Sequence, residues 1–132
     1  MTAAKEKLLL AEAFARVVVR EDGIVSVKLK GFLKPDQMKK SLSAIHQAVT
    51  GNDKLKLLLI DQKELKVLSK EVQDHLIQEI VKLGAYILRV AVIKPDDPFA
   101  LAGMNAVESS AQANKGKNFA HEGEAIEWLL KG

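Results

Sequence analysis

Short segments rich in valine, isoleucine and leucine alternate along this chain with longer segments in which apolar residues recur every three or four positions. Such alternation is typical of a sheet whose parallel strands are joined by helices. We therefore expect an α/β fold with a mixed, mainly parallel sheet of about five strands and with about four helices. The expected strands are residues 14–20, 25–30, 55–61, 89–94 and 118–120, and the expected helices are residues 35–49, 70–83, 98–111 and 125–129.

The first two strands should form an N-terminal β-hairpin. Glu21, Asp22 and Gly23 separate them, and an Asp-Gly pair is a strong tight-turn signal. A hairpin makes the first strand antiparallel to the second, whereas crossover helices make the later strands parallel. Residues 55–61 are almost all apolar, which predicts a central strand with both faces covered.

The chain has the length of one domain and contains no cysteine. Its 132 residues match the usual size of a domain, and no linker or repeat divides them, so we expect a single domain over residues 1–132. The lack of cysteine excludes disulfide bonds, thiolate metal sites and cysteine nucleophiles.

Charge and hydropathy argue against nucleic acid and membranes as partners. Lysine and arginine number 20 against 17 acidic residues, but acidic residues are interleaved with them and aromatic residues make up only 5%. Nucleic-acid surfaces combine clustered basic residues with aromatic platforms or arginine forks. The apolar run at residues 8–10 is interrupted by Glu12 before a signal core forms, and no stretch reaches the ~20 apolar residues of a membrane span. We therefore expect a cytoplasmic protein.

The sequence lacks the common motifs of catalysis. It contains no glycine-rich phosphate loop and no hydrolase nucleophile elbow. His46, His75 and His121 are far apart in the sequence, and none has a second histidine at metal-ligand spacing. We therefore expect no catalytic residue, no metal site and no cofactor, and a protein that is not an enzyme.

Ligands of parallel sheets bind outside the carboxyl ends of the strands. Asp61 ends the central strand, where it either takes a polar role or accepts hydrogen bonds from backbone amides of the following loop. Lys63 and Lys94 either hold an anion together or are ordinary solvated lysines. Asp97 is explained by capping of the third helix, and Ser69 lies where the N-cap of the second helix belongs.

Five segments of the chain have a characteristic order and spacing: LLLID (57–61), the loop to Ser69, RVAVI (89–93), KPDDPFA (94–100) and EAIEWL (124–129). Together they resemble the SpoIIAA-like, or STAS-like, domains of bacteria, in particular their small stand-alone members. The resemblance covers residues 14–130 and implies a sheet of about five strands wound with helices as a β-α superhelix.

The resemblance also implies a function. In anti-sigma-factor antagonists with this domain, a kinase phosphorylates a serine that begins the helix after the central strand. Ser69 occupies that place, but Leu68 stands where those proteins have aspartate, so Ser69 is either a phosphosite or only a helix cap. The resemblance implies a non-enzymatic regulatory or protein-interaction module. The alternative is a domain that binds a small apolar molecule or a lipid, as the related CRAL-TRIO carriers do.

The third helix is the expected contact surface. Residues 98–107 contain no charged residue, and only one stripe of them can face the sheet. Phe99, Leu101 and Met104 are the candidate interface residues, for a homodimer or for an unknown protein partner. The alternative is that the last helix covers these residues within one chain.

Overall fold

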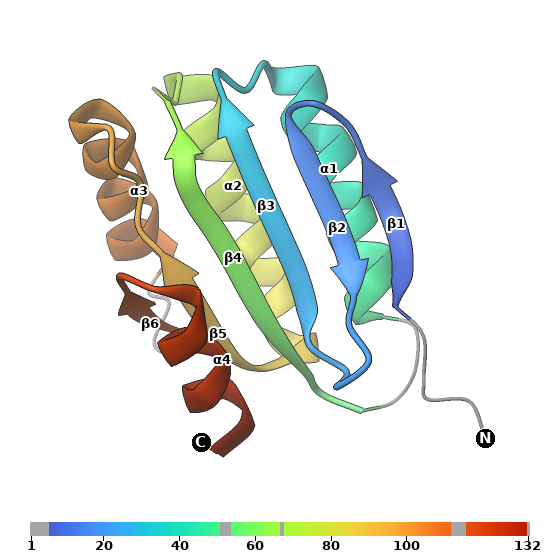
Figure 1. Ribbon diagram of the computed structural model, residues 1–132. Coiled ribbons are helices and arrows are strands. Elements are labelled where there is room, and N and C mark those ends of the chain that lie inside the picture. Colours follow the sequence, from blue (N-terminus) through green and yellow to red (C-terminus); the bar gives the residue numbers. More distant parts are fainter. Residues whose placement is uncertain (1–5, 51–53, 67, 112–115, 132) are drawn as a thin grey trace.

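The computed structural model describes residues 6–50, 54–66, 68–111 and 116–131, without the side chains of residues 107–111. Within these ranges, six strands form one sheet in chain order (Figure 1). The elements are β1 (Lys7–Ala11), β2 (Ala15–Val19), β3 (Val25–Gly31), α1 (Pro35–Val49), β4 (Lys56–Leu65), α2 (Lys70–Leu83), the 3-10 helix η1 (Gly84–Tyr86), β5 (Ile87–Ile93), α3 (Pro98–Ala111), β6 (Gly116–Phe119) and α4 (Glu122–Lys131).

The strand directions follow the sequence pattern. β2 and β3 are antiparallel and β3 to β6 are parallel, which confirms the expected hairpin and the mainly parallel sheet. The hairpin turn closes because Gly23 has a φ of 87°, a conformation that side chains with a Cβ rarely adopt. The Gly23 N–H donates to the Arg20 carbonyl at 2.9 Å, and the Asp22 carboxylate accepts from the Ile24 N–H at 3.2 Å.

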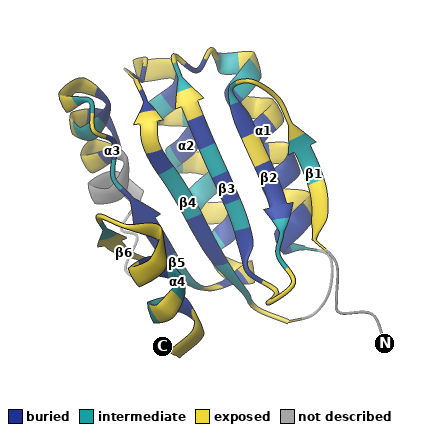
Figure 2. Ribbon diagram, viewed as in Figure 1, coloured by how far each residue is buried: buried dark blue, intermediate teal, exposed yellow. Residues whose placement is uncertain are grey.

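The sheet carries helices on both faces, but unequally. α1 and α2 cover one face, where the larger apolar core lies, with fully buried residues such as Val27, Leu65 and Val72 (Figures 1 and 2). α4 packs on the opposite face against β4, β5 and β6, where Leu59 and Leu129 belong to a second, smaller core. The half of this second face that β1, β2 and β3 form carries no helix in Figure 1.

The sheet has six strands rather than about five, because residues 7–11 form the edge strand β1. β1 pairs antiparallel with β2, and its register is irregular between Leu8 and Leu10. The sequence suggested only a run too short for a targeting signal. An edge strand hydrogen-bonds on one side and is half exposed, so its pattern is weak and its pairing depends on the neighbouring strand.

The central strand β4 is longer than expected, since it continues past Asp61 to Leu65. Lys28 of β3 pairs with Asp61 and Lys30 pairs with Glu64, so β4 contains one extra residue between these two pairs. Such a bulge lets a strand carry polar residues near its end while Leu65 returns to the core.

The third helix packs mainly against α2 rather than against the sheet, which differs from the expectation. Gly103 of α3 makes this contact close, because a Cβ at that position would lie 3.5 Å from the Leu68 Cβ and 3.2 Å from the Gln73 Nε2. None of the described helices is long and apolar enough to cross a membrane.

Candidate functional site at the carboxyl edge of the sheet

The loops that follow β3, β4 and β5 lie at one end of the molecule, which we call the carboxyl edge. Because these strands are parallel, their carboxyl ends and the starts of α1, α2 and α3 meet there (Figure 1). The loops are tied together by their backbones: the Lys66 N–H donates to the Gly31 carbonyl at 2.9 Å, and the Asp96 N–H donates to the Lys63 carbonyl at 3.2 Å. The edge is therefore one continuous surface.

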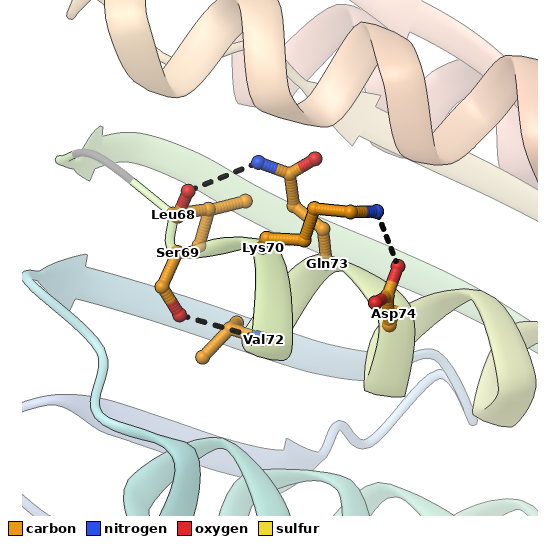
Figure 3. A network of polar contacts seen from close by, with 6 residues as sticks. All are labelled: Leu68, Ser69, Lys70, Val72, Gln73 and Asp74. Carbon is orange, nitrogen blue, oxygen red and sulfur yellow. Dashed lines mark hydrogen bonds and ion pairs between the residues drawn. The ribbon is translucent and has the colours of Figure 1, made fainter.

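Ser69 lies in the middle of this edge as the N-cap of α2 (Figure 3). Its side-chain oxygen accepts a hydrogen bond from the Val72 N–H at 3.2 Å, which confirms the capping role. The turn is fixed further by Gln73, whose Nε2 donates to the Leu68 carbonyl at 3.0 Å, and by the ion pair between Lys70 and Asp74 at 3.3 Å. Ser69 itself is exposed to solvent.

Two aspartates of the edge also bind backbone amides. Asp97 Oδ1 accepts from the N–H groups of Phe99 at 2.9 Å and Ala100 at 3.1 Å, so it caps α3 as expected. Asp61 Oδ1 accepts from the Lys63 N–H at 3.0 Å. This bond lies within the bulge of β4 rather than in a loop, because the strand continues beyond Asp61.

The two candidate lysines occupy neighbouring segments but have different surroundings. The Lys94 ammonium donates to Asn105 Oδ1 of α3 at 2.5 Å, which directs this side chain toward the helix. Lys63 is exposed on β4. The structure therefore explains Lys94 by a contact between a loop and α3, and a joint anion site stays a prediction.

Two phenylalanines project from the carboxyl edge into solvent. Phe32, directly after β3, is 71% exposed, and Phe99, in the first turn of α3, is 72% exposed. Of the other expected interface residues, Leu101 is half-buried. Met104 was a wrong choice for an interface, because it is 5% exposed and packs in the larger core.

The sequence pattern assigned no role to Phe32. A signal was available in the sequence, because Phe32 and Leu33 are neighbouring apolar residues directly after Gly31. In the structure Leu33 is buried and Phe32 is exposed. Two neighbouring apolar residues after a strand cannot both point into the core.

A shallow groove of about 260 Å³ runs between the start of α1 and the neighbouring part of α2. Its floor contains the buried Met38 and Val72, and the half-buried His75 lies along it. The sequence placed His75 beside an apolar stripe but could not show that a groove lies between α1 and α2. The remaining lining residues are Pro35, Lys39, Glu71, Asp74 and Gln78.

The clearest electrostatic perturbation belongs to Glu64 of β4. A hydrogen bond from Lys28, together with the charges of Lys30 and Lys66, lowers the pKa of this exposed carboxyl below its usual value. Lys28 lies 3.2 Å and Lys30 4.0 Å from Glu64 Oε2. Over the described part of the chain, no group of three histidine or acidic residues could hold a metal ion.

A solved structure matches this arrangement of strands and helices: an uncharacterised protein of the DUF3478 family with a SpoIIAA-like fold, from Shewanella loihica PV-4, with a TM-score of 0.63 and 18% identity over 94% of this chain and 91% of that chain. No protein-family model and no curated protein matches the sequence. The chain therefore has a SpoIIAA-like fold, as its sequence motifs suggested.

Proposed function

We propose that this chain is a non-enzymatic, regulatory protein-interaction module of the STAS-like type, which contacts its partner through the carboxyl edge. The observation that carries the proposal is the exposure of Phe32 and Phe99 at this edge. Fully burying a phenylalanine side chain stabilises a contact by roughly 1.5–3 kcal/mol. Aromatic residues are also enriched at protein interfaces and among the residues that dominate their energy.

The position of Ser69 adds a route for regulation. β4 lies between β3 and β5 in the sheet, so the turn with Ser69 lies between the loop of Phe32 and the turn of Phe99. A phosphate on Ser69 would place about two negative charges between the two aromatic residues. It would be tolerated by α2, since a helix N-terminus favours negative charge, and it would change which partner surface fits the edge.

Affinity capture with two matched double variants tests the proposal. Phe32→Glu/Phe99→Glu removes the aromatic pair, and Val81→Glu/Leu130→Glu places the same charges at apolar residues that are 63% and 51% exposed elsewhere on the molecule. We expect a protein retained by the wild type and by the control variant to be lost from the first variant. Equal retention by all three would contradict the proposal.

The partner is either another protein or a second copy of this chain. Sedimentation velocity of the wild type and of Phe99→Glu separates these two cases, because self-association through the start of α3 predicts a dimer that the substitution dissociates. If the wild type is still monomeric at about 0.5 mM, its self-association is weaker than that of any stable homodimer. The partner is then a different protein.

The groove between α1 and α2 favours a second candidate function, the binding of a small molecule. Its volume of about 260 Å³ lies just below the usual range for ligand pockets, and its floor of Met38 and Val72 is apolar. Native mass spectrometry of the protein purified from its own cells tests this function. A small molecule that stays bound to the wild type, but not to Met38→Trp, would support it.

A further inference from the structure

The second face of the sheet is only half covered. α4 packs on this face over β4, β5 and β6, whereas α1 contacts β1, β2 and β3 from the opposite side. In Figure 1 the viewer looks onto β2 and β3 with no helix in front of them, while α4 stands in front of the sheet beside them. We call the uncovered part, formed by β1, β2 and β3, the open half.

The strand register shows which side chains the open half presents. Residues that pair across neighbouring strands lie on the same face, so Leu8, Val18 and Ser26 form one row. Leu8 is 53% exposed. Arg16 and Lys28 form the adjacent row, which continues to Asp61 of β4. Val18 is only 7% exposed, so the open half presents Leu8 as an exposed large apolar side chain beside the basic Arg16 and Lys28.

The open half carries more positive than negative charge. Lys28 and Lys30 share the carboxylate of Glu64, Arg20 pairs with Asp22 at 3.1 Å, and Asp61 lies next to Lys28 in the same row. Within the described ranges, the side chain of the exposed Arg16 makes no ion pair or hydrogen bond. A ligand that brings carboxylates would find cations there that are only partly neutralised.

α4 shows that this face accepts the apolar side of an amphipathic helix. It is an acidic amphipathic helix that buries Ala125 and Leu129 while Glu124 and Glu127 remain exposed. A basic residue of the sheet fixes its end: Arg89 Nη2 donates to the Leu129 carbonyl at 2.7 Å. Cations near the last turn of a helix are favourable because its carbonyl groups carry a partial negative charge.

We propose that the open half binds an acidic amphipathic helix of a partner protein, laid beside α4. Leu8 would contact the apolar stripe of that helix, and Arg16 and Lys28 would pair with its carboxylates. A flat membrane fits less well, since α4 projects from the same face beside the open half. Nucleic acid also fits less well, because neither row contains an aromatic side chain on which bases could stack. The surface is separate from the carboxyl edge, so either proposal can fail alone.

Nuclear magnetic resonance titration of the full chain tests the inference with a defined probe. The probe is a synthetic peptide with the sequence of residues 121–131, compared with the same peptide in which its glutamates are replaced by lysine. Amide shifts report the place of binding as well as the affinity. We expect saturable binding of the acidic peptide with a Kd below about 1 mM, shifts centred on β1 to β3, and no binding of the basic peptide.

Matched charge reversals complete the test. Arg16→Glu/Lys28→Glu should weaken the binding of the acidic peptide by about fivefold or more, as expected when two interfacial charges are reversed. Lys70→Glu/Lys82→Glu makes the same change of charge at exposed lysines of α2, and should leave the Kd unchanged. The carboxyl-edge variant Phe32→Glu/Phe99→Glu should also bind normally, which separates this proposal from the previous one.

Four results would overturn the inference. They are the lack of saturable binding up to about 1 mM, shifts confined to β4, β5 and β6 because the peptide replaces α4, and equal weakening by both charge-reversed variants. The fourth is that phosphatidylserine vesicles or single-stranded DNA bind to the chain through Arg16 and Lys28 while the peptide does not bind. Circular dichroism melts of each variant verify that a loss of binding does not result from unfolding.

Discussion

Single side chains at the carboxyl edge satisfy backbone groups that the helices and the bulge leave without partners. Ser69 and Asp97 accept hydrogen bonds from the first N–H groups of α2 and α3, and Asp61 accepts one within the bulge of β4. A polar residue at the end of a strand therefore has a structural role before any functional one. For Ser69 the capping role and the proposed phosphorylation use the same oxygen, so phosphorylation would exchange a capping hydroxyl for a phosphate at the same helix end.

Substitution of Ser69 shows how much its capping hydrogen bond contributes to the stability of the protein. Ser69→Ala removes the acceptor for the Val72 N–H and should lower the free energy of unfolding by about 0.5–2 kcal/mol. Ser69→Asp keeps an acceptor and should stay close to the wild type in stability. Urea denaturation measures both, with Ser43→Ala at an exposed position of α1 as the control. If Ser69→Ala and Ser43→Ala unfold alike, the hydrogen bond to Val72 does not stabilise α2.

Glu64 should make stability depend on pH in the acid range. The hydrogen bond from Lys28 and the charges of Lys30 and Lys66 lower its pKa in the folded state, so the unfolded chain binds the proton more tightly. The contribution of Glu64 is therefore fully present above the ordinary carboxyl pKa of 4.5, and it is lost as the pH falls through the lower folded-state value. We expect wild type to exceed Glu64→Gln in stability near neutral pH, with the difference vanishing in acid.

Urea denaturation of both proteins over a series of pH values measures that difference. High salt is the control, because about 1 M salt screens the charges of exposed groups and should reduce the difference at neutral pH. A difference that grows as the solution becomes more acidic would contradict the assignment.

The helices are positioned as much by each other as by the sheet. α3 rests mainly on α2, and Gly103 allows the two helices to approach closely beside Leu68 and Gln73. The Gln73 side chain that faces Gly103 also binds the Leu68 carbonyl just before α2. The start of α2, the cap at Ser69 and the position of α3 are therefore mechanically connected.

A larger side chain at position 103 should disturb this contact. Gly103→Leu forces the Gln73 side chain to shift, because a Cβ at position 103 would lie 3.2 Å from its Nε2, and overpacking of this kind costs about 1–3 kcal/mol of unfolding free energy. Ala102→Leu places the same side chain on an exposed position of the same helix and should change stability by less than about 0.5 kcal/mol. Thermal and urea denaturation compare the two variants. Equal stability would show that α3 does not depend on close approach to α2.

At the scale of the whole molecule, the central strands of the sheet are protected from solvent and the edge strands are less so. β3, β4 and β5 each have a strand on both sides, whereas β1 and β6 pair on one side only within the described sheet. The residues of β6 are mostly exposed, and those of β3 and β5 are mostly buried or half-buried. Local opening should therefore begin at the two edges.

Amide hydrogen exchange tests this gradient. We expect the slowest exchange in β3, β4 and β5, and exchange at least about tenfold faster in β1 and β6, because edge strands open without global unfolding. Addition of denaturant should merge the slow amides into one class that follows global unfolding. Uniform protection across all six strands would contradict the gradient.

The sequence by itself determined the parts of this fold that depend on local chemistry. Alternating apolar segments predicted the order of strands and helices, Asp22-Gly23 predicted the hairpin, and capping residues predicted the starts of α2 and α3. These features could be found because periodicity, turn residues and caps act within a few positions of the chain. The motif order also indicated the SpoIIAA-like fold.

Only the tertiary structure decided what depends on distant neighbours. β1 is a strand because β2 supplies its hydrogen bonds, Met104 is buried because α3 leans on α2, and Phe32 is exposed because Leu33 takes the place in the core. The groove between α1 and α2 and the uncovered face of the open half likewise depend on how elements far apart in sequence pack together. Burial is a property of the assembled layers, so no single segment encodes which apolar side chains remain outside.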